Sequence, residues 1–488
     1  MLSKKMSSNL LGLLEGRLIL GALLAFGLHA QPFDLVIAGG RVMDPETKLD
    51  AVRFVGIRNG RIAAISAQPL AGKQTLDAKG LVVAPGFIDL HSHGQSDENY
   101  RYKARDGVTT ALEMEVGVSP VKPWVAERQG KALIHFGASA GHIPTRMAAV
   151  GDTSDWLPRG PAATRAATQA EQEKTMALLR QGLREGGLGI GMGIAYTPFA
   201  SRTEILDVFK LSAAVKVPVF VHMRSGGRKD PGVVDALQEV IADAAATGSP
   251  LHVVHINSSS GRAWADAIGM VRGARERGLD ITTEAYPYVA GMTRLDSAIF
   301  DPGWREKLEV RYEDLMWVET GERLTEKTFA ERRQQGGTVI TFTMREEDVD
   351  QAIAAPDVMV ASDGWITNGK GHPRAAGTYA RVLGVYVRER KVLTLMQALH
   401  KISYMPAKRL ESFTPVMKRK GRIQVGADAD IAIFDPATVI DRSTYQNPAQ
   451  YSTGIKHVLV NGVVVVQDEK LAEGVFPGQP ILSAVTVP

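Results

Sequence analysis

The feature that most constrains this chain is an apolar run, Phe87-Ile88-Asp89-Leu90, that ends in His91-Ser92-His93. Side chains alternate between the two faces of a strand, so His91 and His93 project from the same face and can hold one metal ion. We therefore expect a metal clamp at the end of a buried strand. The remaining ligands must come from later in the chain.

Residues 86–417 alternate between segments typical of strands and segments typical of helices. The predicted strands lie at 107–116, 133–138, 189–195, 217–222, 251–256, 280–285 and 358–362. A period of 3.6 residues predicts helices at 169–184, 203–215, 233–247, 262–277 and 395–410. Repetition of this pattern over about 330 residues predicts a (β/α)8 barrel of the TIM type, with its chemistry at the C-terminal ends of the strands. Residues 295–338, with Asp301-Pro302-Gly303 and scattered charges, indicate an excursion from it.

Both ends of the chain contain short strands with similar turns. Residues 33–84 include an Asn59-Gly60 turn. Near the other end, residues 426–435 and 455–465 are again typical of strands, and an Asn461-Gly462 turn interrupts the second of these segments. We expect one small β-sandwich domain formed by residues 31–85 and 418–488, with the barrel of residues 86–417 inserted between them.

Three further strand ends carry metal-ligating or acidic residues. His222 and His255 each follow an apolar run, and Asp363 follows the run at 358–362. His252 and His255 are three residues apart, so on a regular strand they face opposite sides. We choose His255 for the site because it is nearer the strand end, and expect His252 outside, under a helix. Together with His91 and His93, these residues predict a metal site.

A site for two metal ions also needs a bridging anionic ligand. Glu113 and Glu115 lie on one face of an otherwise apolar strand, where a charge is costly unless it is paired or bound to a cation. At least one of them is therefore expected to be a ligand, and Glu115 is preferred because it is closer to the strand end. The fourth predicted strand, 189–195, offers no lysine for this position.

Composition limits the classes of function. The chain has 488 residues, of which 44% are hydrophobic and 23% charged, as in soluble globular proteins. Its net charge of +4 is spread thinly, without the basic, aromatic-rich stretches of nucleic-acid-binding proteins. The absence of cysteine excludes disulfides and thiolate ligands. We expect a small-molecule substrate, no nucleic acid and no stable membrane partner, and the oligomeric state stays open.

The N-terminus has the pattern of a secretory signal. Lys4, Lys5 and Arg17 precede an apolar core at 18–28, and Ala30 stands just before Gln31. This predicts a signal peptide over residues 1–30 and export to the periplasm or the medium. Glu15 and the large Leu28 leave two alternatives, an uncleaved anchor and a mis-assigned start. The protein is expected in the cytoplasm if this segment is not a functional signal.

The combined motifs resemble the amidohydrolase superfamily. The resemblance rests on residues 84–93 after a β unit, and on Lys420-Gly421-Arg422-Ile423 with residues 426–430 before the closing strands. Internal strings resemble its N-acyl-D-amino-acid deacylase branch, which contains D-aminoacylases and D-glutamate deacylases. These strings are Asp106-Gly107-Val108-Thr109-Thr110, Gly193-Ile194-Ala195-Tyr196-Thr197-Pro198, His222-Met223-Arg224, Ala285-Tyr286-Pro287-Tyr288, Ser362-Asp363-Gly364, and Gly371-His372-Pro373-Arg374.

The resemblance implies hydrolysis of the amide bond of an N-acyl-D-amino acid, which releases a D-amino acid and a carboxylate. It also implies that His91, His93, His222 and His255 hold metal, that Glu115 bridges, and that Asp363 is the general base. D-aminoacylases of this branch commonly have a cysteine where this chain has glutamate. The first choice of cofactor is Zn²⁺, as one or two ions, with another divalent metal as the alternative.

An N-acyl amino acid carries an α-carboxylate, for which a guanidinium is the best bidentate partner. Arg374 is the first candidate and Arg224 the second, with Tyr288 beside the site and Tyr196 lining the pocket. The alternatives are a salt bridge between loops for Arg374 and a packing role for Tyr196.

Two other functions deserve comparison with a deacylase. The first is a hydrolase of cyclic amides or dipeptides, of the hydantoinase or isoaspartyl-dipeptidase type, and the missing lysine of the fourth strand argues against it. The second is a scaffold without catalytic activity. Retention of four histidines, a carboxylate and Asp363 argues against the scaffold.

Overall fold

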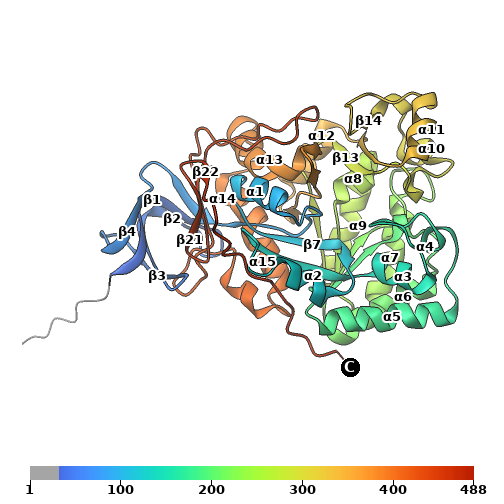
Figure 1. The fold of residues 1–488 in the computed structure, drawn as a ribbon, viewed down its shortest axis with the longest axis horizontal. Helices are drawn as coiled ribbons and strands as arrows, with labels where there is room; N and C mark the ends of the chain where they lie inside the picture. The colour runs from blue at the N-terminus through green and yellow to red at the C-terminus, as the bar shows by residue number, and fades with distance from the viewer. Residues whose placement is uncertain (1–31, 488) are drawn as a thin grey trace, which may run out of the picture. The chain divides into compact units, whose positions relative to one another are not determined.

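The computed structural model describes residues 32–487 (Figure 1). The expected signal peptide, residues 1–30, lies outside this range. Within the described part of the chain, no helix is both long and apolar enough to cross a membrane. The expected domain boundaries at 85/86 and 417/418 stay a prediction, because the chain from Phe33 onward forms one compact unit by its internal contacts.

Eight parallel strands form the expected barrel. Their order in the sheet follows the sequence from β6 to β12 and ends with β16. The strands are β6 (Phe87–Asp89), β7 (Val108–Val118), β8 (His135–Gly141), β9 (Ile190–Gly193), β10 (Val219–His222), β11 (Leu251–Val253), β12 (Ile281–Ala285) and β16 (Val358–Val360). The first and last strands meet just past their ends, where the Asp363 amide donates to the His91 carbonyl at 2.7 Å and Ser92 bridges Gly364. The barrel is thus nearly closed.

Helices follow the strands and cover them. They are α1 (Asp97–Arg105), α2 (Val121–Arg128), α3 (His142–Val150), α4 (Pro161–Thr164), α5 (Gln169–Arg184), α6 (Arg202–Val215), α7 (Val233–Thr247), α8 (Ile256–Ser260), α9 (Trp264–Glu276), α12 (Glu346–Ala354), α13 (Arg374–Arg381), α14 (Leu395–Leu399) and α15 (Met405–Leu410). Local signals fix their ends. Thr168 and Glu171 form a capping box at the start of α5, and Gly248 ends α7 with a φ of 73°. The helix expected at 395–410 is divided by a π-helical turn, η6 (His400–Tyr404).

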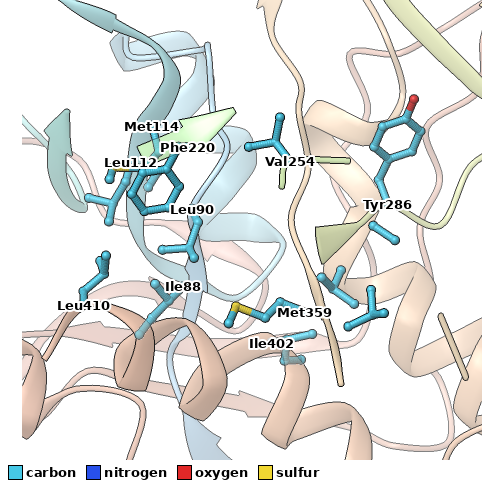
Figure 2. Packing of buried hydrophobic residues seen from close by; sticks show 14 of the residues in the cluster. Ile88, Leu90, Leu112, Met114, Phe220, Val254, Tyr286, Met359, Ile402 and Leu410 are labelled. Carbon is cyan, nitrogen blue, oxygen red and sulfur yellow. The ribbon is translucent and has the colours of Figure 1, made fainter. Parts of the chain in front are cut away.

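The barrel strands are apolar because both of their faces are buried. Figure 2 shows Ile88, Leu112 and Met359 from three of these strands packed near Ile402 and Leu410 of the C-terminal helical segment. These side chains are all at most 3% exposed. The core closes one end of the barrel and leaves the C-terminal ends of the strands for polar side chains.

Strands from both chain ends, blue and dark red in Figure 1, form one sheet of nine strands. They are β1 (Phe33–Asp44), β2 (Leu49–Arg58), β3 (Arg61–Ser66), β4 (Gly72–Asp77), β5 (Val82–Pro85), β19 (Ile431–Phe434), β20 (Ile455–Val460), β21 (Val463–Gln467) and β22 (Lys470–Leu471). Side chains such as Ile37, Val55 and Ile433 share one apolar core, so the sheet folds around residues from both ends of the chain. This confirms the expected pairing of the two ends.

The excursion expected at 295–338 forms a small three-stranded antiparallel sheet with two helices. Its elements are β13 (Ala290–Arg294), β14 (Leu315–Trp317), β15 (Thr338–Phe342), α10 (Trp304–Leu308) and α11 (Glu326–Gln335). It has its own core, in which Trp304 and Phe329 stack with ring centroids 4.9 Å apart. A two-stranded hairpin, β17 (Ile366–Thr367) with β18 (Lys370–Gly371), follows the last barrel strand.

Candidate metal centre and active site

His91 and His93 lie directly after β6 and point to a common position. Their Nε2 atoms are 3.3 Å apart, and each is 3.2 to 3.3 Å from Oδ1 of Asp363. His91 Nε2 is also 2.6 Å from Oε2 of Glu115. Two histidine nitrogens and the Glu115 carboxylate therefore converge into a donor set suited to a divalent metal ion, with the Asp363 carboxylate beside it.

Glu115 connects this group to a second one. Its Oε1 lies 2.9 Å from Nδ1 of His222, and its Oε2 lies 3.5 Å from Nε2 of His255. The two histidine nitrogens are 3.1 Å apart. Possible ligand atoms in each group, His91, His93, Glu115 and Asp363 in one and Glu115, His222 and His255 in the other, lie within 4.8 Å of one another. The arrangement fits two ions bridged by Glu115.

Two further glutamates contact the Nδ1 atoms of the ligand histidines. Glu113 is 2.7 Å from Nδ1 of His93, and Glu284 is 2.7 Å from Nδ1 of His91. Such contacts fix the orientation of a metal-binding imidazole and leave its Nε2 free for the ion. Burial opposes ionisation of Glu284, but hydrogen bonds from His252 and His91 lower its pKa to about 2. Because Glu113 contacts Nδ1 of His93 and belongs to neither group of possible ligands, it supports the site rather than joining the two groups.

The structure corrects the expectation for His252. This histidine is fully buried and its Nε2 lies 3.1 Å from Glu284, so it belongs to the polar network inside the barrel and not under a helix. The argument from alternating faces does not reach His255, because β11 ends at Val253 and His255 has a φ of 29°. His252 faces the interior from within β11, and the backbone turn after the strand brings His255 to the interior as well.

Glu284 was not expected from the sequence as a site residue. The signal for it was present, since it is a carboxylate inside a barrel strand, β12, as Glu113 and Glu115 are in β7. A buried charge in a barrel strand indicates a partner, which here is a pair of histidines.

Asp363 has a strained backbone and a buried side chain. Its φ of 51° lies in the left-handed region, which costs of order 1–3 kcal/mol for a residue other than glycine. Burial disfavours the charged carboxylate, but Arg374 and His91 hold the pKa of Asp363 well below its usual value. Asp363 is therefore ionised and able to accept a proton.

A buried network under the site joins the ends of β6 and β16. Lys103 Nζ donates to Asp89 at 2.7 Å and to the Ser362 hydroxyl at 2.6 Å. The amide of Ser362 donates to the other oxygen of Asp89 at 3.0 Å. These bonds position His91, two residues after Asp89, next to Asp363, one residue after Ser362.

The metal cluster opens into a cavity of about 560 Å³ whose wall includes residues of the excursion. Tyr196 lines this cavity, with its ring edge toward His222 and its hydroxyl 3.0 Å from that of Thr293. Arg224 also lines it, but its guanidinium already donates to Glu239 and to two backbone carbonyls. Arg224 is thus less available to a substrate than expected.

Arg374 is fully buried beside Asp363. Its Nη2 lies 3.0 Å from Oδ2 of Asp363, and its guanidinium lies 4.4 Å from the centre of the Tyr286 ring. The contact with Asp363 is an ion pair without hydrogen-bond alignment, and within residues 32–487 no side-chain nitrogen of Arg374 has a hydrogen-bond partner. Buried donors of this kind normally have a hydrogen-bond partner. Arg374 lies behind Asp363 and is not among the residues that line the cavity.

Tyr288 does not lie where the sequence suggested. Its hydroxyl donates to Asp441 at 3.3 Å, and Arg381 covers its ring at 4.9 Å. Tyr286 is the tyrosine of this segment that lines the cavity. Strand β12 ends at Ala285, and the chain turns after it, so alternation along the strand does not predict which tyrosine faces the site.

Comparisons with known proteins agree with this geometry. A model described as amidohydrolase family matches residues 74–466. A D-aminoacylase of Alcaligenes xylosoxydans xylosoxydans is 32% identical over 90% of this chain and 96% of that protein. An N-acyl-D-glutamate deacylase of the same organism is 31% identical over 89% of this chain and 94% of that protein.

A solved structure is similar over nearly its whole length. It is an N-acyl-D-glutamate deacylase from Bordetella bronchiseptica, complexed with zinc and a phosphonate inhibitor that mimics the tetrahedral intermediate of the reaction. Its TM-score is 0.79 at 28% identity, with 93% of this chain and 100% of that chain covered. With a family model over most of its length and these relatives, the chain belongs to the amidohydrolase family.

Proposed function

We propose that the protein is a metal-dependent deacylase that hydrolyses N-acyl-D-amino acids to a D-amino acid and a carboxylate. The observation that carries the proposal is the cluster bridged by Glu115, with Asp363 between that cluster and Arg374. The relatives that act on N-acyl-D-amino acids by name support the choice of substrate.

In this proposal His91, His93, Glu115, His222 and His255 hold one or two divalent ions, with Zn²⁺ as the first choice. The donor set of imidazole nitrogens and a carboxylate supports zinc, as does the zinc bound by the Bordetella deacylase. A bound zinc ion supplies Lewis-acid polarisation of the amide carbonyl and makes water a better nucleophile at neutral pH.

Asp363 accepts the proton of the attacking water and passes it to the leaving nitrogen, first as base and then as acid. Its Oδ1 faces His91 and His93, and its Oδ2 faces Arg374. Arg374 binds the α-carboxylate of the substrate. The ring of Tyr286 packs against the guanidinium of Arg374, and Tyr196 forms the part of the cavity wall next to His222.

A hydrolase of cyclic amides remains the alternative within the family. Strand β9, Ile190-Gly191-Met192-Gly193, contains no lysine, and Glu115 already occupies the position between the two groups of ligands. The guanidinium of Arg374, which pairs with Asp363 but makes no hydrogen bond within residues 32–487, also favours a linear substrate with a free carboxylate. Both observations favour the deacylase.

The test is a panel of N-acetyl-D-amino acids, their L enantiomers and a hydantoin, incubated with the metal-loaded protein. We expect release of D-amino acids alone. Asp363→Asn should lower kcat by about 10²- to 10⁴-fold, the usual contribution of general acid–base catalysis, while its metal content matches that of the wild type. Preferred cleavage of the hydantoin, or full turnover by Asp363→Asn, would contradict the proposal.

We also propose that the protein is exported and that the mature chain begins at Gln31. The support is the basic segment, apolar core and small residue of positions 1–30. N-terminal sequencing of the protein from fractionated cells tests this. Recovery of the full-length chain from the cytoplasm would contradict it.

A further inference from the structure

Two tryptophans form an apolar wall next to the metal cluster, and no step of the proposed reaction uses them. Trp156 and Trp365 both line the cavity, with ring centroids 4.9 Å apart and an interplanar angle of 72°. Each ring also meets His93 edge-on, at 5.3 Å for Trp156 and 5.5 Å for Trp365. The three rings form one continuous surface at the site.

Trp156 is held in an unfavourable position. It is 38% exposed, and its φ of 44° places a bulky residue in the left-handed region. Exposure of a large aromatic ring and backbone strain both cost free energy, and strain of this kind concentrates at functional sites. A ring that served only for packing would be buried on an ordinary backbone.

The loop that carries Trp156 is anchored at both ends. Asp152 accepts hydrogen bonds from the amides of Gly160 and Ala162, each at 3.0 Å. Arg159 donates to Asp296 of the excursion at 2.8 Å. The ring of Trp156 is therefore presented to the cavity by a loop fixed in advance, and no closure is needed to bring it there.

The position of Asp363 indicates which part of a substrate meets this wall. Oδ2 of Asp363 faces Arg374, whereas Oδ1 faces His93, the residue that both tryptophans contact. A substrate whose α-carboxylate lies on Arg374 directs its acyl chain away from that carboxylate, across the scissile carbonyl. The acyl chain then extends toward His93 and the two tryptophans.

We propose that Trp156 and Trp365 form the acyl subsite and select N-acyl-D-amino acids with an apolar acyl group longer than acetyl. This inference rests on the proposed deacylase function. Aliphatic or arylacetyl chains fit the wall because the two rings offer a flat, apolar and uncharged surface.

The experiment measures kcat/KM for one D-amino acid carrying formyl, acetyl, butyryl and hexanoyl groups. Full burial of a methylene gains up to about fourfold per group, so we expect the wild type to prefer hexanoyl over acetyl by about tenfold or more. Trp156→Ala should reduce this preference to about threefold or less, and Trp365→Phe, with a smaller ring, should reduce it by a lesser factor. Trp365→Phe retains a ring, so the core packing around residue 365 is kept.

Phe199→Ala is the matched control, because Phe199 is an exposed aromatic residue, at 54%, outside the cavity wall. It should keep the preference of the wild type. A second series, with acetyl held constant and the amino-acid side chain varied, should respond equally in the wild type and in Trp156→Ala.

Several outcomes overturn the acyl subsite. They are a wild type without dependence on acyl length, equal loss at every acyl length in both tryptophan variants, and a change confined to the side-chain series. A wild type that turns over no N-acyl-D-amino acid at any length overturns the proposed function, and the subsite with it.

Discussion

Glu115 is the residue on which both groups of metal ligands depend. It contacts His91, His93, His222 and His255 through its two oxygens, while the carboxylate of Glu113, two residues earlier, contacts Nδ1 of His93. The carboxylates thus have different tasks on one strand. A bridging carboxylate holds ions, whereas a supporting one orients a ligand.

This difference can be measured with two isosteric variants. Glu115→Gln removes the anionic bridge, so we expect the purified protein to lose at least one divalent ion. Glu113→Gln should keep the same number of ions but bind them about 10- to 100-fold more weakly, as for other supporting residues. Metal analysis and competition with a chelator give both quantities. Equal metal content and affinity in the two variants would show that the bridge is misassigned.

Arg374 allows a test of carboxylate recognition. Arg374→Lys keeps a charge near Asp363 but loses the planar guanidinium, so kcat/KM for an N-acyl-D-amino acid should fall about 100-fold. The corresponding N-acyl-D-amino-acid amide lacks the α-carboxylate, so the wild type and Arg374→Lys should hydrolyse it equally slowly. A similar loss on both substrates would mean that Arg374 acts only through its ion pair with Asp363.

The sequence predicted most residues of the cluster from two signals. His91, His93, His222, His255 and Asp363 follow apolar runs, whereas Glu115 is a charge inside an apolar strand, and the structure brings all six together. The roles of Tyr288 and Arg224 were not predictable, since they contact partners that only the tertiary fold supplies. His252 and Glu284 are paired across neighbouring strands, and the sequence gives no register for that pairing.

At the scale of elements, the barrel depends on a junction between its first and last strands. Asp89, the last residue of β6, accepts from both Lys103 and Ser362, and all three side chains are at most 1% exposed. Breaking a buried ion pair by removing one charge costs about 3–5 kcal/mol, because the other charge stays buried without compensation.

Asp89→Asn should therefore lower Tm clearly in thermal unfolding at a fixed scan rate. Asp34→Asn is the matched control, because its ion pair with Lys73 is exposed. The control should leave Tm unchanged. If both variants had the Tm of the wild type, the Lys103 network would not join these strands in the way described.

Element boundaries were predictable where local signals are strong. Helices α5 and α7 have the bounds expected from periodicity, since a capping box and a C-terminal glycine mark them. Strand β11 is shorter than expected, because the chain turns at His255 to place a ligand. The turn η6 divides the last helix and leaves no mark in the hydrophobic period.

At the scale of the whole molecule, the nine-stranded sheet is joined to the barrel by a buried polar cluster. Lys420 and His135, which lies in barrel strand β8, both contact Asp430. Burial alone would raise the pKa of Asp430, but Lys420 and His135 hold it far below its usual value. The ionised carboxylate therefore stabilises the folded state.

The sign of the pH dependence follows from this lowered pKa. The stabilisation is present above the unfolded pKa of about 4 and is lost as pH falls below it. Asp430→Asn should lower Tm at pH 7, and the difference from the wild type should shrink between about pH 5 and about pH 3. Thermal unfolding of both proteins across this range is the measurement. A constant difference would assign the effect to packing instead of charge.

Stepwise addition of Zn²⁺ to the metal-free protein tests the metal-dependent deacylase function most directly. Bound metal and D-amino acid release from an N-acetyl-D-amino acid are recorded together. We predict no release without metal, release that rises with bound Zn²⁺, and none from the L enantiomer. Turnover by the metal-free protein, or a native protein that binds no divalent ion, would contradict it.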